Sequence, residues 1–127
     1  MDEVHGESAH GAPVFEDLVF EEQGPVARVM LNRPEVINAL SKRLSAELHQ
    51  VLDLVRDSET VKVLVISGAG GNFCAGDDLS EMASGAWGNA NQVMRRVRMY
   101  QDMANTLEEL DKITVCAVDG WCVGGGL

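Results

Sequence analysis

The sequence predicts a domain of the α/β class. Its 127 residues are enough for one domain with a hydrophobic core. Strand-like and helix-like segments follow one another in the order β-β-α-β-α-β, which is typical of a sheet covered by helices. Two of the predicted strands lead into glycine-containing turns that can leave backbone N–H groups free to bind a ligand.

Two strands are predicted to form an antiparallel hairpin after an N-terminal tail. Residues 1–13 are acidic and polar and lack the basic and apolar segments of a signal peptide, so we expect a disordered tail. The first strand is expected at Val14–Glu22 and the second at Val26–Leu31, with Gly24-Pro25 between them. Pro34 then ends the second strand, because proline lacks an N–H donor and fixes φ.

A helix and a buried strand are expected next. Ser41 is a suitable N-cap for a helix over Lys42–Arg56. One face of this helix is apolar at helical spacing: Leu44, Leu48, Val51, Leu52 and Val55. Its polar residues lie mainly on the other side: Glu47, Gln50, Asp53 and Asp57. The β-branched run Val61–Ile66 predicts a buried strand, and we expect helices on both of its faces.

The second half is predicted to contain two helices and a last strand. A short helix over Asp78–Ala83 is followed by a flexible connection at residues 84–89 and a long helix over residues 91–111. The apolar stripe of the long helix comprises Val93, Val97, Tyr100, Ala104, Leu107 and Leu110, widened by Met94, Met99 and Met103. Three cations, Arg95, Arg96 and Arg98, are expected on a solvated face of this helix. The last strand is expected at Ile113–Val118.

Composition excludes several classes of partner. A formal net charge of −10 argues against a broad nucleic-acid surface and against binding to an anionic membrane. No apolar run reaches the ~20 residues of a membrane span. Three cysteines in apolar or glycine-rich surroundings suit reduced thiols of a cytoplasmic protein, and we expect Cys74 and Cys122 to be small packed side chains rather than nucleophiles. Their spacing gives no metal-ligand set.

Nucleotide-binding motifs do not fit the first glycine turn. A Rossmann turn would need glycine where Phe73 stands. A phosphate-binding loop that ends at Gly76 would need Lys and then Ser or Thr, but Asp77 and Asp78 follow. These carboxylates would repel a phosphate group.

The two turns, Phe73–Leu79 and Val118–Leu127, favour binding of an oxygen that becomes negative during a reaction. Backbone N–H groups at strand-to-helix turns suit that task, and Gly124–Gly126 lets the main chain approach a ligand without a Cβ in the way. For either turn alone, packing of a glycine-lined strand end against another backbone is an equally good explanation. Two such turns, joined by one helical crossover, favour the functional explanation.

Three segments in this order resemble the enoyl-CoA hydratase/isomerase (crotonase) family: residues 31–40, 70–79 and 115–127. The resemblance covers about residues 15–127 and implies a crotonase-like ββα spiral core, of which residues 14–127 would be the N-terminal part. It also implies binding of an acyl-CoA thioester and assembly into homotrimers or hexamers. Coenzyme A would enter as part of the substrate, with no separate cofactor and no metal.

Matched residue by residue, the resemblance implies that the backbone amides of Asp77 and Gly125 hold the thioester oxygen and stabilise an enolate. The residues expected to line the thioester and pantetheine are Ala75, Asp77, Asp78, Leu79 and Ser80. Those expected near the nucleotide end of CoA are Glu35, Val36 and Asn38. We expect Asp78 to cap a helix rather than act as an acid or base.

Asp77 departs from the family pattern, in which a small or apolar residue is usual at that position. Only its N–H is needed for the oxyanion, so we expect its carboxylate to point outward. An inward carboxylate would add a polar or acid–base group to the site.

The resemblance implies enoyl-CoA hydration as the leading activity. Isomerisation and aromatic acyl-CoA hydratase-lyase chemistry are alternatives, the latter because of Gly120-Trp121-Cys122, and a non-catalytic binding or structural role is a further one. The glutamates of the family's hydratases match positions after Leu127. We therefore expect a chain truncated before the second half of the domain, without hydration activity by itself.

Overall fold

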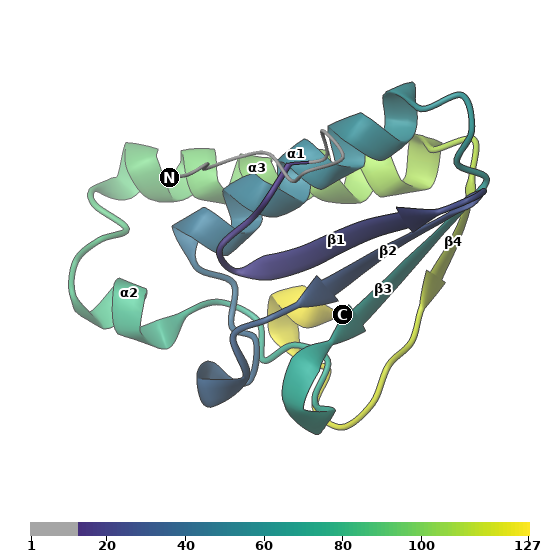
Figure 1. Ribbon diagram of the computed structural model, residues 1–127. Helices are drawn as coiled ribbons and strands as arrows, with labels where there is room; N and C mark the ends of the chain where they lie inside the picture. Colours follow the sequence, from purple (N-terminus) through teal and green to yellow (C-terminus); the bar gives the residue numbers. More distant parts are fainter. Residues whose placement is uncertain (1–12) are drawn as a thin grey trace, which may run out of the picture.

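A four-stranded sheet organises the computed structural model, which describes residues 13–127 (Figure 1). The strand order is β1 (Leu18–Gln23), β2 (Val26–Leu31), β3 (Val63–Gly68) and β4 (Ile113–Cys116). The β1–β2 pair is antiparallel, whereas the β2–β3 and β3–β4 pairs are parallel. Residues 1–12 of the predicted tail, which was expected at residues 1–13, lie outside the described residues.

β1 begins four residues later than the sequence predicts. The carboxylate of Glu47 accepts hydrogen bonds from the amides of Glu16 and Asp17, at 2.9 and 2.8 Å. These amides therefore bind a helix side chain instead of a neighbouring strand. Glu47, expected on the polar side of its helix, is consequently buried.

The helix α1 (Lys42–Asp57) forms as predicted and covers the sheet. The Ser41 side chain caps it by accepting a hydrogen bond from the Leu44 amide at 3.1 Å. All five residues of the predicted apolar face are buried in the core, together with residues of β1, β2 and β3.

Two further helices follow β3: α2 (Leu79–Ala83) and α3 (Ala90–Glu109). Figure 1 shows α1 and α3 side by side on the same face of the sheet. Along β3, Leu64 and Ile66 are buried while Val63 and Val65 are only half-buried. The expectation of helices on both faces is therefore wrong for residues 13–127.

The predicted apolar stripe of α3 is confirmed in part, because Tyr100, Leu107 and Leu110 pack against the core. The buried residues of α3 are Arg96 and Met103, whereas Val97 and Ala104 are exposed. The expectation of a solvated Arg96 is therefore wrong, although Arg95 and Arg98 are exposed as predicted. The reason lies in the site, where Arg96 has specific partners.

Candidate functional site

The two glycine turns lie side by side at the carboxyl ends of the parallel strands. Cys74 and Cys122 form a parallel bridge, and the Trp121 carbonyl accepts hydrogen bonds from the amides of Phe73 and Cys74, each at 3.0 Å. The Val123 amide donates to the Cys74 carbonyl at 3.1 Å. Two segments about 50 residues apart in sequence are thus paired through their backbones.

Gly76 is the point of closest approach between the turns. Its φ is +89°, and a Cβ at this position would lie 2.9 Å from the Val123 carbonyl oxygen and 3.1 Å from the Gly125 amide nitrogen. A larger residue would force the two turns apart. Glycine at this position is therefore required by the juxtaposition itself.

A third segment, residues 37–40, is hydrogen-bonded to the first turn. The Leu40 amide donates to the Gly76 carbonyl at 2.7 Å, and the Asp78 amide donates to the Leu40 carbonyl at 3.2 Å. The Ala75 amide donates to the Ile37 carbonyl at 2.9 Å. The chain around residue 77 is therefore fixed on both sides.

Within the described residues, the backbone amides of Asp77 and Gly125 donate no hydrogen bond to the protein. The two residues are neighbours in space, because Oδ1 of Asp77 lies 3.7 Å from the position of a Cβ on Gly125. Two available N–H groups on rigid, adjacent turns are the arrangement that stabilises a developing oxyanion. The structure thus places Asp77 and Gly125 next to each other, and their role as oxyanion donors stays a prediction.

A cavity of about 230 Å³ adjoins these turns. Its lining is mainly apolar and comes from β2, α1, β3, α3 and both turns, including Leu31, Leu48, Ile66, Cys74, Met103 and Gly125. Tyr100 is the polar exception. A mainly apolar cavity beside two backbone turns suits the apolar part of a ligand.

The Asp77 carboxylate points inward, contrary to the sequence expectation. Its Oδ1 is buried, lies beside Gly125 and has no hydrogen-bond partner among residues 13–127. The direction follows from the bridge between Leu40 and Asp77, which sets the alternation of side chains along this strand-like stretch.

Burial, and next the nearby Asp77 carboxylate, raise the pKa of the Tyr100 phenol above its usual value.

Asp78 has the capping role that the sequence predicts. Its carboxylate accepts hydrogen bonds from the Glu81 amide at 3.1 Å and from Nη1 of Arg33 at 3.0 Å. Burial alone would raise the pKa of Asp78, but these hydrogen bonds and the Arg33 charge bring it below its usual value. Asp78 is therefore an ionised anchor of the first turn.

The residues expected at the CoA nucleotide end differ in exposure. Asn38 is fully buried, and its amide is used within the protein: Oδ1 accepts from the Arg33 amide, and Nδ2 donates to the carbonyls of Ala69 and Asn72. Asn38 therefore positions the loops and presents no side-chain surface to a ligand. Glu35, Val36, Leu79 and Ser80 are exposed and Ala75 is half-buried, so a ligand can reach them.

Arg96 organises a cluster that the sequence interpretation missed. Its Nη2 donates to the Leu40 carbonyl at 3.0 Å and to Oε1 of Glu81 at 3.1 Å, and its Nε donates to the Tyr100 phenol oxygen at 3.2 Å. The guanidinium also lies 4.7 Å from the centre of the Trp87 ring. The one local signal was the i, i+4 spacing of Arg96 and Tyr100.

The cysteines are described by their burial, their hydrogen bonds and their lack of disulfide pairing. Burial raises the pKa of the Cys74 thiol, which donates to the Asn38 carbonyl at 3.2 Å. Cys122 is half-buried, and all three cysteines, which lie in the described part, are unpaired. Across residues 13–127, no three His, Cys, Asp or Glu side chains come together as metal ligands, and no helix is long and apolar enough to cross a membrane.

Comparison with protein families gives a match over residues 21–127 to the family described as enoyl-CoA hydratase/isomerase. Among curated relatives, this chain is similar to 1,2-epoxyphenylacetyl-CoA isomerase of Escherichia coli, with 35% identity over 80% of this chain and 39% of that protein. It is also similar to the peroxisomal Delta(3,5)-Delta(2,4)-dienoyl-CoA isomerase of Arabidopsis thaliana, with 32% identity over 80% of this chain and 40% of that protein. The chain thus spans about two fifths of the length of these relatives.

Solved structures show the same fold. Pseudomonas aeruginosa AtuE matches with a TM-score of 0.83 and 36% identity over 87% of this chain and 43% of that one. An enoyl-CoA hydratase from Bacillus anthracis matches with a TM-score of 0.79 and 31% identity over 87% and 43%. The predicted fold class is confirmed, with this chain corresponding to less than half of each neighbour. A cytoplasmic location stays a prediction, since relatives include proteins named peroxisomal and mitochondrial.

Proposed function

Since this chain belongs to the enoyl-CoA hydratase/isomerase family, we propose that it supplies the oxyanion site of an enzyme that acts on acyl-CoA thioesters. The amides of Asp77 and Gly125 would hold the thioester oxygen, and the acyl group would enter the apolar cavity. Coenzyme A would act only as part of the substrate. The natural protein would be a homotrimer or hexamer.

The observation that carries this proposal is the pair of available donors on adjacent, rigid turns. Removal of a proton next to a thioester, or addition of water across a conjugated double bond, puts negative charge on the thioester oxygen. Removal of one such donor costs about 3–4 kcal/mol in other oxyanion sites. The donors are backbone groups, so the site keeps them whatever the side chain at residue 77.

Two reactions are equally supported. Hydration of a 2-enoyl-CoA was the leading expectation from the sequence, and structural neighbours include proteins titled enoyl-CoA hydratase. Double-bond isomerisation is favoured by the isomerase names of several relatives. Both reactions pass through charge on the thioester oxygen and differ in the groups that move protons or water.

A direct test uses the complete protein encoded by the gene and an acyl-CoA with a ¹³C-labelled thioester carbonyl. Two hydrogen bonds to the carbonyl oxygen should move its infrared band to lower frequency on binding. Free CoA and the free acyl acid serve as controls, because each lacks the thioester. A bound thioester with an unshifted carbonyl band would rule out the oxyanion role of the turns.

A second measurement separates the two reactions. Crotonyl-CoA and a 3-enoyl-CoA are supplied to the same preparation, and water addition is compared with double-bond shift. Hydration that greatly exceeds isomerisation would identify a hydratase, and the reverse would identify an isomerase. Turnover of neither substrate, despite a shifted carbonyl band, would favour a binding role.

A further inference from the structure

We propose that a cavity between the start of α1 and the first half of α3 binds a phosphate group of a small ligand other than the acyl-CoA substrate. This inference goes beyond the acyl-CoA function and does not rest on it. The cavity measures about 370 Å³. Its lining consists of three cations, an indole, an amide and a thioether: Lys42, Arg95, Arg96, Trp87, Gln92 and Met99.

Two residues of this lining have buried donors without partners. Nη1 of Arg96 and Nε1 of Trp87 are buried, and neither has a hydrogen-bond partner among residues 13–127. The Arg96 side chain is only 5% exposed. A buried donor without an acceptor is unfavourable, so a ligand that brings several acceptor oxygens into this cavity gains from both contacts.

The Trp87 ring controls access to the guanidinium. It lies over the guanidinium carbon of Arg96, which is 4.7 Å from the centre of the ring. Trp87 stands in the connection between α2 and α3, and on either side of it Gly85 and Gly88 adopt positive φ values of +80° and +76°. A ligand oxygen reaches Nη1 when the ring turns aside. Binding therefore changes the surroundings of the indole, which gives an optical signal.

The charges around the cavity favour a dianion. Nη2 of Arg96 is already paired with Oε1 of Glu81 at 3.1 Å. Lys42 and Arg95 form no ion pair within residues 13–127. Two uncompensated cations match a phosphate group, which carries nearly two negative charges and three acceptor oxygens, better than they match a carboxylate. Because the formal net charge of the protein is −10, this local field has to overcome a general repulsion of anions.

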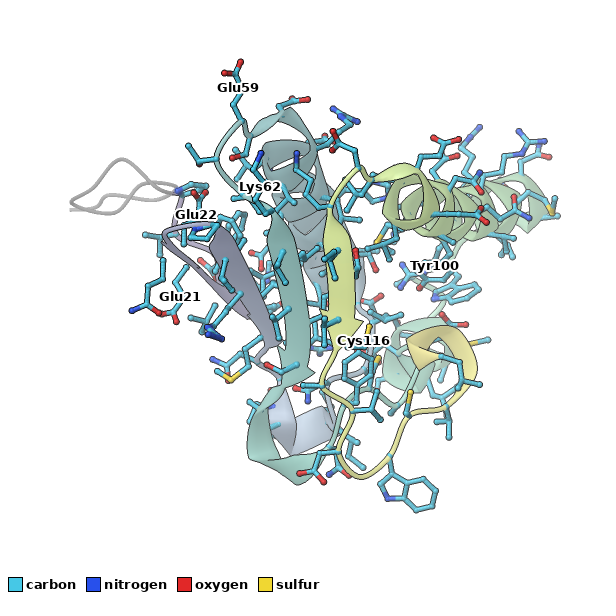
Figure 2. All side chains as sticks on the ribbon, turned by 90° about the vertical axis from the view of Figure 1, so that its right-hand side faces the viewer. Glu21, Glu22, Glu59, Lys62, Tyr100 and Cys116 are labelled. Atoms are coloured by element: carbon cyan, nitrogen blue, oxygen red, sulfur yellow. The ribbon has the colours of Figure 1, made fainter. Side chains whose placement is uncertain are left out.

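The cationic cavity is separate from the apolar cavity beside the glycine turns. Within the described part of the chain, the two cavities share no lining residue. Tyr100 lines the apolar cavity, and Figure 2 shows it extending from α3 toward the coil that contains the three glycines. Both cavities can therefore be occupied at the same time.

The test titrates inorganic phosphate into the complete protein encoded by the gene, by calorimetry at about pH 8 and constant ionic strength. CoA is present at saturation throughout, so that phosphate cannot bind where CoA binds. Phosphate should bind at least about tenfold more tightly than acetate, which carries a single charge. Tryptophan fluorescence should change on binding, and the change should be absent in Trp87→Phe.

The main variant is the double substitution Lys42→Gln/Arg95→Gln, because both side chains are exposed and neither belongs to the core. It should weaken phosphate binding by about tenfold or more. Trp87→Phe removes the indole donor and should weaken binding about fivefold. Arg98→Gln is the matched control: it removes an exposed cation of α3 that does not line the cavity, and it should change the affinity by less than about twofold.

Three results would each overturn the proposal. The first is the absence of phosphate binding when CoA is saturating. The second is an equal affinity for phosphate and acetate. The third is an affinity for phosphate that Arg98→Gln lowers as much as the double variant does, since the attraction would then come from the general charge of the surface.

Discussion

The two glycine turns make similar shapes but are held in different ways. In the first turn, Phe73, Cys74, Gly76 and Asp78 are buried, and hydrogen bonds join the turn to Leu40, Ile37 and Arg33. In the second turn, residues 120–127 are exposed or half-buried, and the contacts to the rest of the chain run largely through the first turn. The first turn is thus a scaffold, and the second takes its position from it.

The difference shows what positions the backbone amide of Gly125. The position of the Gly125 amide depends on backbone pairing with Cys74 and on the close approach at Gly76. Changes in the anchors of the first turn should therefore propagate to the second. The second turn is also flanked by exposed apolar residues, such as Val118 and Trp121.

The largest effect is expected from Gly76→Ala, which breaks the contact that both turns share. The new methyl group would lie 2.9 Å from the Val123 carbonyl oxygen, at a φ of +89°. Turnover by the complete protein should fall by about 10²–10³, as when an oxyanion donor is removed. Gly24→Ala is the control, because Gly24 also has a positive φ but no atom within 4 Å of its Cβ position. Equal activities of the two variants would show that the close approach of the two turns at Gly76 is not needed for activity.

A smaller effect is expected from Asn38→Ala, which removes an anchor of the first turn alone. Three hydrogen bonds from a fully buried side chain would be lost, leaving the Arg33 amide and the carbonyls of Ala69 and Asn72 without partners. Urea unfolding should show a loss of about 2–4 kcal/mol. The exposed Asn32→Ala should change the stability by less than about 0.5 kcal/mol. A similar loss in both variants would show that Asn38 is not an anchor.

The smallest effect is expected from Asp78→Asn, which keeps a capping side chain but removes its charge. Because the folded pKa of Asp78 is lowered, the charge stabilises the protein above the unfolded pKa of about 3.9. That contribution is lost as the pH falls through the lower, folded pKa. At neutral pH the variant should be about 1–2 kcal/mol less stable than the wild type, and the gap should narrow below about pH 4.

Asp53→Asn provides the matched control for this charge. Asp53 pairs with Arg56 on the surface, where both side chains are more than half exposed, so its removal should cost less than about 0.5 kcal/mol at any pH. A pH-independent gap for Asp78→Asn would mean that the Arg33 pair contributes nothing through its charge.

Local patterns predicted most of the elements correctly. β2 has the predicted ends, α1 begins after its predicted cap at Ser41, and Asp78 caps α2. The errors fall where a distant residue intervenes. At the start of β1, the Glu47 carboxylate accepts hydrogen bonds from the amides of Glu16 and Asp17. β4 was expected to reach Val118 but ends at Cys116, although the Ala117 amide still donates to the Ile66 carbonyl at 2.8 Å.

In the site too, the residues of the two turns were predicted, whereas some side-chain positions were not. The family resemblance assigned the oxyanion donors to Asp77 and Gly125, and the structure places these two residues next to each other. The inward carboxylate of Asp77 and the buried Arg96 could not be predicted, since both depend on how α3 and residue 40 pack against the first turn. Arg96 was expected on a solvated face with its charged neighbours Arg95 and Arg98, because the one local signal for its burial is the i, i+4 spacing to Tyr100.

The sequence by itself determined the strands, the helix caps and the two turns where N–H groups become available, because these depend on residues within one or two turns of the chain. The tertiary structure alone decided that the turns meet at Gly76, that Oδ1 of Asp77 is buried beside Gly125 and that Arg96 is buried and hydrogen-bonded to Tyr100. Those outcomes depend on contacts between segments 15 to 56 residues apart. Pairing over such distances is selected by the packing of the whole sheet and its helices, which no local pattern encodes.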